Sequence, residues 1–177
     1  MSGMPEIEVL LSEEDLSARI DALADRLAPK LQGDWTAVSI LIGATPFTSD
    51  LMKALARRGV HPMMDVIWLE SYRDARESTG RVVVRADISR PVTGRGVLLI
   101  DDVFDTGRTL NFARNHMLAK GARQVLTCAL AIKPWAPSGG SDKVDFYAYQ
   151  APGRFLVGYG MDDAGLYRGL PYIGAID

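Results

Sequence analysis

The chain has 177 residues, of which 47% are hydrophobic and 24% are charged, and its formal net charge is −2 at pH 7. This composition indicates one globular domain with a substantial core, and the bulk charge gives no indication of a nucleic-acid or membrane partner. The single cysteine, Cys128, excludes an internal disulfide and a cysteine-based zinc cluster, so the cytoplasm is the expected compartment.

The first third of the chain is predicted to form a helix followed by a strand–helix–strand unit. Ser12 stands before an apolar stripe at helical spacing and is the expected N-cap of an amphipathic helix. A strand is expected at 35–42, a helix at about 47–58 and a second buried strand at 63–69. This order predicts a right-handed βαβ unit.

The middle of the chain continues the alternation after an arginine-rich interruption. Residues 70–95 are polar, and only 82–84 has the composition of a strand, which predicts a hairpin or a mobile arm. A third strand is expected at 97–101, its helix at about 107–120 and a fourth strand at 124–132. The whole pattern predicts an α/β fold with a doubly wound parallel sheet.

The segment 97–110, VLLIDDVFDTGRTL, carries the strongest functional signal. Four apolar residues lead into Asp101 and Asp102, and the loop 105–109 then opens a helix. Ligands of α/β sheets bind at the carboxyl ends of the strands, and the free N–H groups of a helix start attract anions. The threonines and the glycine of this loop would therefore hold a phosphate, while the two acids require hydroxyl donors or a divalent cation.

This segment resembles the phosphoribosyl-pyrophosphate motif of the type I phosphoribosyltransferases, which has four apolar residues, two acids, two apolar residues and then Asp-Thr/Ser-Gly-x-Thr. The resemblance implies that Asp101 and Asp102 bind the ribose hydroxyls, directly or near Mg²⁺. It makes Asp105 the candidate general base, close to N7 of the acceptor base. The residues expected to hold the 5-phosphate are Asp105, Thr106, Gly107, Arg108 and Thr109.

The last third of the chain resembles the hypoxanthine-guanine branch of that family. Lys133 and Pro134 follow a predicted strand, 155–162 reads FLVGYGMD, and 167–171 reads YRGLP. The branch has Lys-Pro, Phe-Val-Val-Gly-Tyr-x-x-Asp and Tyr/Phe-Arg-x-Leu-Pro at the corresponding places. Short strands are expected at 144–149 and 155–159.

The resemblance assigns a role to each of these residues. Lys133 would read the C6 carbonyl of a 6-oxopurine, Phe155 would stack on the ring, and backbone groups near Leu156 and Asp162 would meet the base edge. Asp162 would also lie near a second Mg²⁺, and Arg168 near the pyrophosphate. Structural alternatives are a solvated Lys133, a core Phe155, and a loop ion pair between Asp162 and Arg168.

Two further segments bear on the site. Ser71 and Tyr72 begin the arm and would exclude water when it closes. The branch usually has a basic residue before Gly43, at the pyrophosphate, and Ile42 cannot supply that charge. Either Arg168 or another cation compensates, or pyrophosphate binding is weaker. The stretch 135–141 is unusual for the branch and would alter the hood over the base.

The resemblance implies one phosphoribosyltransferase domain over 1–177. Its core is expected at about 35–134, its mobile arm at about 70–95, and a base-binding hood from about 1–32 and 135–177. The expected activity is purine salvage: transfer of phosphoribosyl from phosphoribosyl pyrophosphate to hypoxanthine or guanine with Mg²⁺, giving IMP or GMP and pyrophosphate, in a homodimer or homotetramer. The alternatives are a regulatory nucleotide-binding relative with little catalysis and a transferase for xanthine or another oxo-base.

Overall fold

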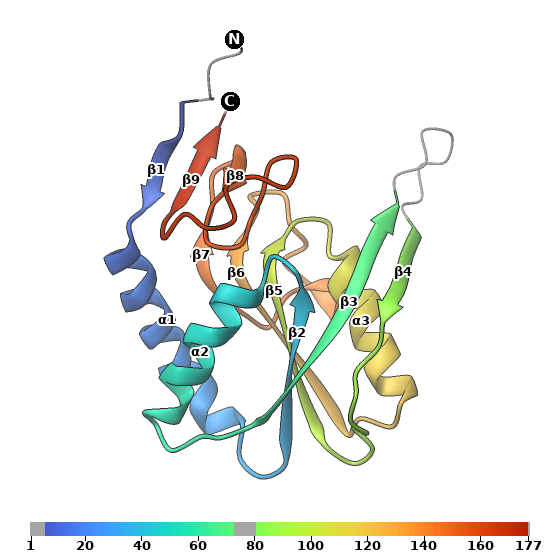
Figure 1. Ribbon diagram of the computed structural model, residues 1–177. Coiled ribbons are helices and arrows are strands. Elements are labelled where there is room, and N and C mark those ends of the chain that lie inside the picture. The colour runs from blue at the N-terminus through green and yellow to red at the C-terminus, as the bar shows by residue number, and fades with distance from the viewer. Residues whose placement is uncertain (1–5, 73–80, 177) are drawn as a thin grey trace.

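A six-stranded sheet in the order β4-β3-β2-β5-β6-β7 forms the centre of the computed structural model, which describes residues 6–72 and 81–176 (Figure 1). Its middle is made of β2 (Trp35–Leu41), flanked by β3 (Met63–Tyr72) and β5 (Gly96–Phe104), and both neighbours run parallel to β2. β2 and β5 are covered on both faces over most of their length, which explains their nearly continuous apolar sequences.

The remaining strands extend the sheet to its two edges. On one side β6 (Gln124–Ile132) and β7 (Phe146–Gln150) continue the parallel arrangement. On the other side β4 (Arg81–Ala86) pairs antiparallel with β3 and forms the expected hairpin at the base of the arm. The tip of the arm, 73–80, lies outside the described residues. The predicted α/β fold with a doubly wound parallel sheet is confirmed.

Helices cover the two faces of this sheet (Figure 1). On one face lie α1 (Glu13–Leu27) and α2 (Thr45–Ala56), and on the other lies α3 (Arg108–Ala119). Ser12 is the N-cap of α1 as predicted: its hydroxyl accepts from the backbone N–H of Asp15, whose side chain accepts from the backbone of Ser12 in return. None of the helices in the described parts of the chain is long and apolar enough to cross a membrane.

The apolar run of β5 joins two hydrophobic cores. Leu98 and Ile100 are buried in the core beneath α1 and α2, whereas Val97 and Leu99 are buried in the core beneath α3. Successive side chains of a strand point to opposite faces, so a strand between two helical layers needs apolar residues at every position.

A second, three-stranded antiparallel sheet joins the two ends of the chain. It consists of β1 (Glu8–Leu11), β9 (Ile173–Ile176) and β8 (Phe155–Val157) in that order, and it lies beyond the carboxyl ends of the main strands (Figure 1). Its strands come from the two segments assigned to the predicted hood, about 1–32 and 135–177; the hood and its base-binding role remain predictions. The strand β9 was not predicted. Short 3₁₀ helices complete the fold at Ala28–Lys30 and Gly140–Asp142.

One predicted boundary is wrong in a way that matters for the site. The third core strand was expected to end at 101, but β5 remains paired with β6 as far as Phe104. Asp102 therefore lies within a paired strand, as Asp101 does, rather than in the loop that follows it. Pairing with a long neighbouring strand sets this boundary, and the local sequence does not reveal it.

Candidate active site

Two adjacent carboxylates at the end of β5 form the floor of the candidate site. Asp101 is 7% exposed, and its Oδ1 accepts from the backbone N–H of Asp102 at 3.0 Å. Burial and the neighbouring charge of Asp102 raise the pKa of Asp101 well above its usual range, and burial also raises the pKa of Asp102. Two adjacent acids, Asp101 buried and Asp102 partly buried, favour a bound cation or hydroxyl donors at this point.

The loop after β5 has the geometry of an anion site. Gly107 adopts a positive φ of 81° and precedes α3, and the N–H of Arg108, the first residue of that helix, donates to the hydroxyl of Thr106 at 3.5 Å. The other N–H groups of the first turn of α3 are available to a ligand. Asp101 and residues 103–110 line a cavity of about 50 Å³, which gathers the predicted phosphate residues Asp105, Thr106, Gly107, Arg108 and Thr109 around one space.

The loop after β2 packs directly on the acid pair. An ideal Cβ on Gly43 would lie 1.8 Å from Oδ2 of Asp102, so this contact accepts only glycine. Gly160 is equally constrained, because its Cβ would lie 2.0 Å from the carbonyl oxygen of Gly43. Ile42 follows a cis peptide bond and is 52% exposed. Its side chain brings no charge to a position where the branch has a cation.

Asp162 and Arg168 are paired with each other. Arg168 Nη2 lies 2.7 Å from Asp162 Oδ1, and Nη1 donates to the carbonyl of Gly160 at 2.6 Å. The loop ion pair between Asp162 and Arg168, the structural alternative to a binding role, is thus present. Among the described residues, no group of three or more His, Cys, Asp or Glu side chains is arranged to hold a metal ion. Burial raises the pKa of Asp102 and the charge of Arg168 opposes that rise, so Arg168 still acts on the acid pair. The metal role of Asp162 stays a prediction.

Lys133 lies just after β6 and is half-buried beside the loop 105–109, the candidate phosphate loop. Its backbone N–H donates to the carbonyl of Phe104 at 3.0 Å, and its amine donates to the carbonyl of Arg154. Burial lowers the pKa of Lys133, and the charge of Asp105 opposes this change. Lys133 is therefore not a solvated strand end, because its side chain is held close to the candidate base.

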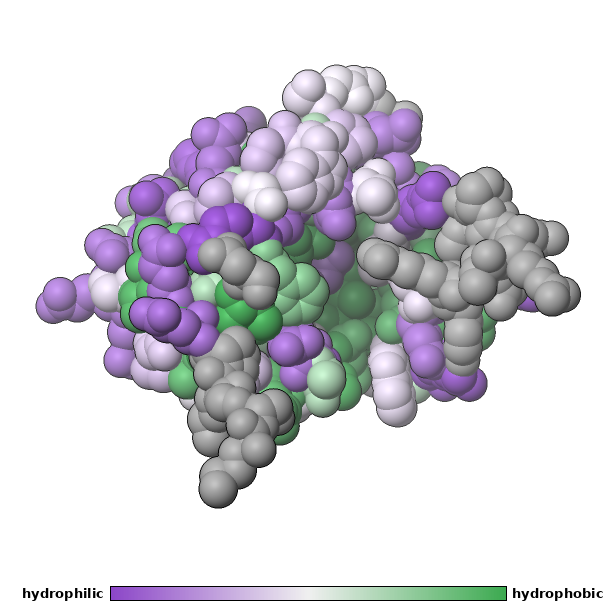
Figure 2. Space-filling view, turned by 90° about the horizontal axis from the view of Figure 1, so that it is seen from above, coloured by the Kyte–Doolittle hydropathy of each residue, from purple (hydrophilic) through white to green (hydrophobic). Residues whose placement is uncertain are grey.

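The first residue of β8 presents an aromatic ring to solvent. Phe155 is 53% exposed, whereas the next residue, Leu156, is 6% exposed and packs in the core. The exposure of Phe155 contradicts the core alternative and leaves a ring surface available for stacking. Seen from above the carboxyl ends of the strands, the molecule is hollowed near the middle of this face, with apolar residues deep in the hollow (Figure 2).

The predicted arm residues are only partly described. Ser71 is exposed near the end of β3 and pairs with Val82, and Tyr72 pairs with Arg81. The side chain of Tyr72 and the tip at 73–80 lie outside the described residues. Whether Ser71 and Tyr72 cover a substrate stays a prediction.

Sequence reasoning did not assign a site role to Trp135. Its indole N–H donates to Oδ1 of Asp105, the candidate base. The available signal was an aromatic residue two positions after Lys133, in a stretch that is unusual for the branch. The contact itself joins two different loops and has no local sequence pattern.

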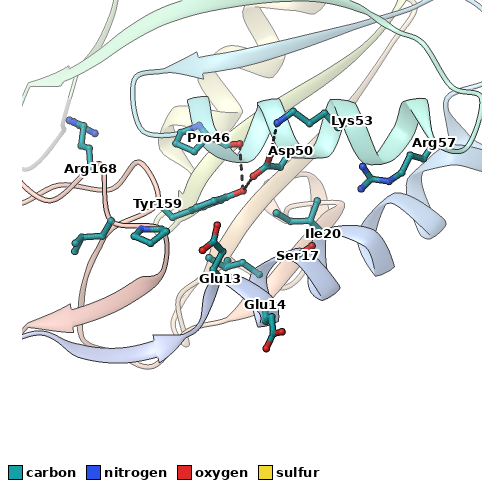
Figure 3. A pocket seen from close by; sticks show the side chains of 14 residues that line it. Glu13, Glu14, Ser17, Ile20, Pro46, Asp50, Lys53, Arg57, Tyr159 and Arg168 are labelled. Carbon is teal, nitrogen blue, oxygen red and sulfur yellow. Dashed lines mark hydrogen bonds and ion pairs between the residues drawn. The ribbon is translucent and has the colours of Figure 1, made fainter.

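A separate cavity of about 650 Å³ lies between α1, α2 and residues 168–171. Figure 3 shows Tyr159 reaching across to α2, where its hydroxyl donates to Asp50 at 2.5 Å, and Lys53 pairs with Asp50 at 3.1 Å. None of the phosphate-loop residues lines this cavity, and Arg168 stands at its border. The chemistry of the acid pair and the phosphate loop is therefore outside it.

A doubly wound sheet with an acid pair and a glycine-opened phosphate loop at its carboxyl edge defines a type I phosphoribosyltransferase. Residues 11–164 match the family model described as phosphoribosyl transferase domain. The chain is 34% identical over 170 residues to a hypoxanthine-guanine phosphoribosyltransferase of Bacillus subtilis, covering 96% of this chain and 92% of that protein. The chain belongs to the hypoxanthine-guanine phosphoribosyltransferase family.

Two further relatives agree with this assignment. A bifunctional protein TilS/HprT of Listeria innocua is 36% identical over 170 residues, and the chain spans 26% of the length of that protein. A crystal structure of a hypoxanthine phosphoribosyltransferase from Staphylococcus aureus has a TM-score of 0.87 and 33% identity, covering 96% of this chain and 91% of that one.

Proposed function

We propose that the protein transfers the 5-phosphoribosyl group of phosphoribosyl pyrophosphate to a 6-oxopurine, hypoxanthine or guanine, and releases pyrophosphate. The products are IMP or GMP, and the role is purine salvage in the cytoplasm. The observation that carries this proposal is the meeting of a phosphate loop, a buried acid pair and Lys133 at one edge of the sheet.

The ribose phosphate is held by β5 and the start of α3. The carboxylates of Asp101 and Asp102 accept hydrogen bonds from the 2- and 3-hydroxyls of the ribose. The N–H groups of the first turn of α3 and the hydroxyls of Thr106 and Thr109 receive the 5-phosphate. The anomeric carbon then lies between the acid pair and the base.

The purine is held between the end of β6 and the hood. The amine of Lys133 donates to the C6 carbonyl, and Phe155 stacks on the ring. An exocyclic amino group at C6 would present donors to a donor, so adenine is refused. As N9 bonds to the anomeric carbon and the bond to pyrophosphate breaks, Asp105 accepts the proton from N7.

The acid pair fits a divalent cation. Carboxylate oxygens are the ligands that Mg²⁺ prefers, and Asp101 and Asp102 are adjacent acids whose pKa values are raised because they are withdrawn from bulk water. We assign Mg²⁺ to them and a second Mg²⁺ to Asp162. Bound Mg²⁺ supplies positive charge beside the departing pyrophosphate. Among the residues of the chain, Arg168 provides the cation that Ile42 cannot.

An exposed apolar face on β3 supports self-association. Met64, Val66 and Trp68 alternate along the strand and are 48%, 37% and 45% exposed. The faces of parallel sheets are ordinarily covered, and the strand neighbour of Trp68 is Leu41, directly before the exposed Ile42. We propose that a second copy of the chain covers this face in a homodimer, from which a homotetramer can be built.

Turnover of a panel of bases tests the activity. Hypoxanthine, guanine, xanthine, adenine and uracil are each offered with phosphoribosyl pyrophosphate and Mg²⁺, and nucleotide and pyrophosphate are measured together. We expect use of hypoxanthine or guanine and rejection of adenine and uracil. Use of xanthine alone would move the assignment to another oxo-base, and nucleotide binding without any turnover would favour the regulatory alternative.

Asp105→Asn tests the general base. The amide cannot accept the proton from N7, so we expect kcat to fall by roughly 10²–10⁴-fold while the affinity for GMP changes little. Stopped-flow turnover and calorimetric GMP binding measure the two quantities separately. Near-normal turnover would contradict the assignment of Asp105.

A further inference from the structure

Trp135 contacts Asp105 and Lys133, two of the residues that would handle the purine, although it is 59% exposed. Its indole N–H donates to Oδ1 of Asp105, and the amine of Lys133 lies 5.8 Å from the centroid of its ring. The ring also rests on the backbone at Gly153, where an ideal Cβ would lie 2.8 Å from Cζ3. The side chain of Trp135 thus contacts Asp105, Lys133 and Gly153.

These contacts connect parts of the site that come from different elements. Asp105 belongs to the loop between β5 and α3, whereas Lys133 follows β6 and its amine also donates to the carbonyl of Arg154. The side chain that joins them is a rigid ring with an N–H donor at its edge and a π face for a cation. Because Gly153 has no side chain, the ring can pack against its backbone; the Cβ of any other residue would clash with the ring.

The hydrogen bond engages only one oxygen of the candidate base. The indole donates to Oδ1, and no described residue donates to Oδ2. Because a carboxylate has acceptor sites on both oxygens, Asp105 can be held through Oδ1 and still receive a proton on Oδ2. The contact therefore orients Asp105 without consuming its capacity as a base.

We infer that Trp135 is a positioning residue for the phosphoribosyl transfer: its indole edge orients the Asp105 carboxylate, and its ring face holds the Lys133 amine at the purine site. This inference rests on the proposed function. The two roles belong to different parts of the side chain, so they can be separated by substitution.

Two variants test the N–H donor and the aromatic ring of Trp135 separately. Trp135→Phe keeps an aromatic face but removes the N–H, whereas Trp135→Gln keeps an N–H donor but removes the ring. We expect Trp135→Phe to lower kcat roughly 10-fold or more, with the KM for the purine within about twofold of wild type. We expect Trp135→Gln to retain most of kcat and to raise the KM for the purine by roughly threefold to tenfold.

A binding measurement independent of turnover accompanies the kinetics. Addition of GMP should change the tryptophan emission of the wild-type protein, and this change should be largely lost in Trp135→Phe. Leu118→Ala, which removes exposed apolar bulk from the last turn of α3, is the control and should behave as wild type.

The outcomes separate the inference from the proposed function. If wild type uses no 6-oxopurine, the proposed function fails, and the inference fails with it. If wild type is active and Trp135→Phe has unchanged kcat, the inference alone is overturned. It is also overturned if Trp135→Phe is faster, because the indole would then obstruct the site, or if Trp135→Gln loses as much kcat as Trp135→Phe.

Discussion

The acid pair on β5 is the residue-scale feature with the strongest electrostatic consequence. Asp101 and Asp102 are adjacent in sequence; burial raises the pKa of both carboxyl groups, and the charge of Asp102 raises the pKa of Asp101 further. The same two carboxyl groups that suit the site for a ligand lower the stability of the ligand-free protein. The site is arranged for a ligand that supplies donors or positive charge, and the protein without that ligand bears the cost of the buried charge.

Asp101→Asn is expected to stabilise the ligand-free protein at pH 8 but not near pH 4. The pKa of Asp101 is raised in the folded state, so its contribution to stability is present at low pH and is lost as the pH rises through the folded pKa. Asparagine removes that loss, which is worth on the order of 1 kcal/mol, or roughly 2–4 °C in Tm for a domain of this size.

Thermal unfolding at the two pH values measures this difference. Asp34→Asn, which removes one exposed carboxylate from the loop before β2, is the matched control for the lost charge. An equal change in Tm at pH 4 and pH 8 would contradict the account given for Asp101. Activity should fall in Asp101→Asn, because the amide is a poorer acceptor for a ribose hydroxyl.

At the scale of elements, the junction between β5 and α3 is the proposed phosphate site. Gly107 holds the left-handed conformation that turns the chain into α3, and its ideal Cβ would lie 3.2 Å from the carbonyl oxygen of Asp142. The residue therefore has both a conformational and a steric reason to be glycine. A change here alters the direction of the first N–H groups of the helix.

Gly107→Ala should weaken phosphoribosyl pyrophosphate binding by roughly tenfold, because the strain at a positive φ and the contact with Asp142 displace the loop. Gly33→Ala is the matched control: Gly33 has a φ of 86°, but its Cβ would meet nothing within 4 Å. Both variants should lose similar stability through the backbone, and only Gly107→Ala should lose affinity by calorimetry. Equal affinities would refute the role of the loop.

Prediction of the elements succeeded where the pattern is local. The apolar periodicities of α1 and the run in β5 identify these elements directly, and the N-cap at Ser12 was predicted from its own few neighbours. The strand β9 was missed because it is only four residues long and depends on pairing with β1 and β8. The end of β5 was misplaced for the same reason.

At the scale of the whole molecule, Met64, Val66 and Trp68 form an apolar face that a single chain leaves exposed to solvent. Trp68→Glu should convert the proposed homodimer to a monomer, with the dissociation constant raised by roughly 30-fold or more, since buried aromatic residues dominate such interfaces. Light scattering after size exclusion measures the mass. Leu118→Glu, which places the same charge on an exposed position of α3, is the control and should leave the mass unchanged. A monomeric wild-type protein would contradict the proposal.

The α/β class, the order of the core strands and helices, and the candidate phosphate loop follow from the amino-acid sequence alone, because each depends on residues close together in the chain. The sequence also supplied the acid pair and Lys133 as candidates. The folded structure shows that Gly43 packs on Asp102 and that Trp135 joins Asp105 to Lys133, contacts between segments far apart in sequence whose geometry follows from how the layers pack. It also selects the Asp162–Arg168 ion pair from the alternatives that the sequence leaves open.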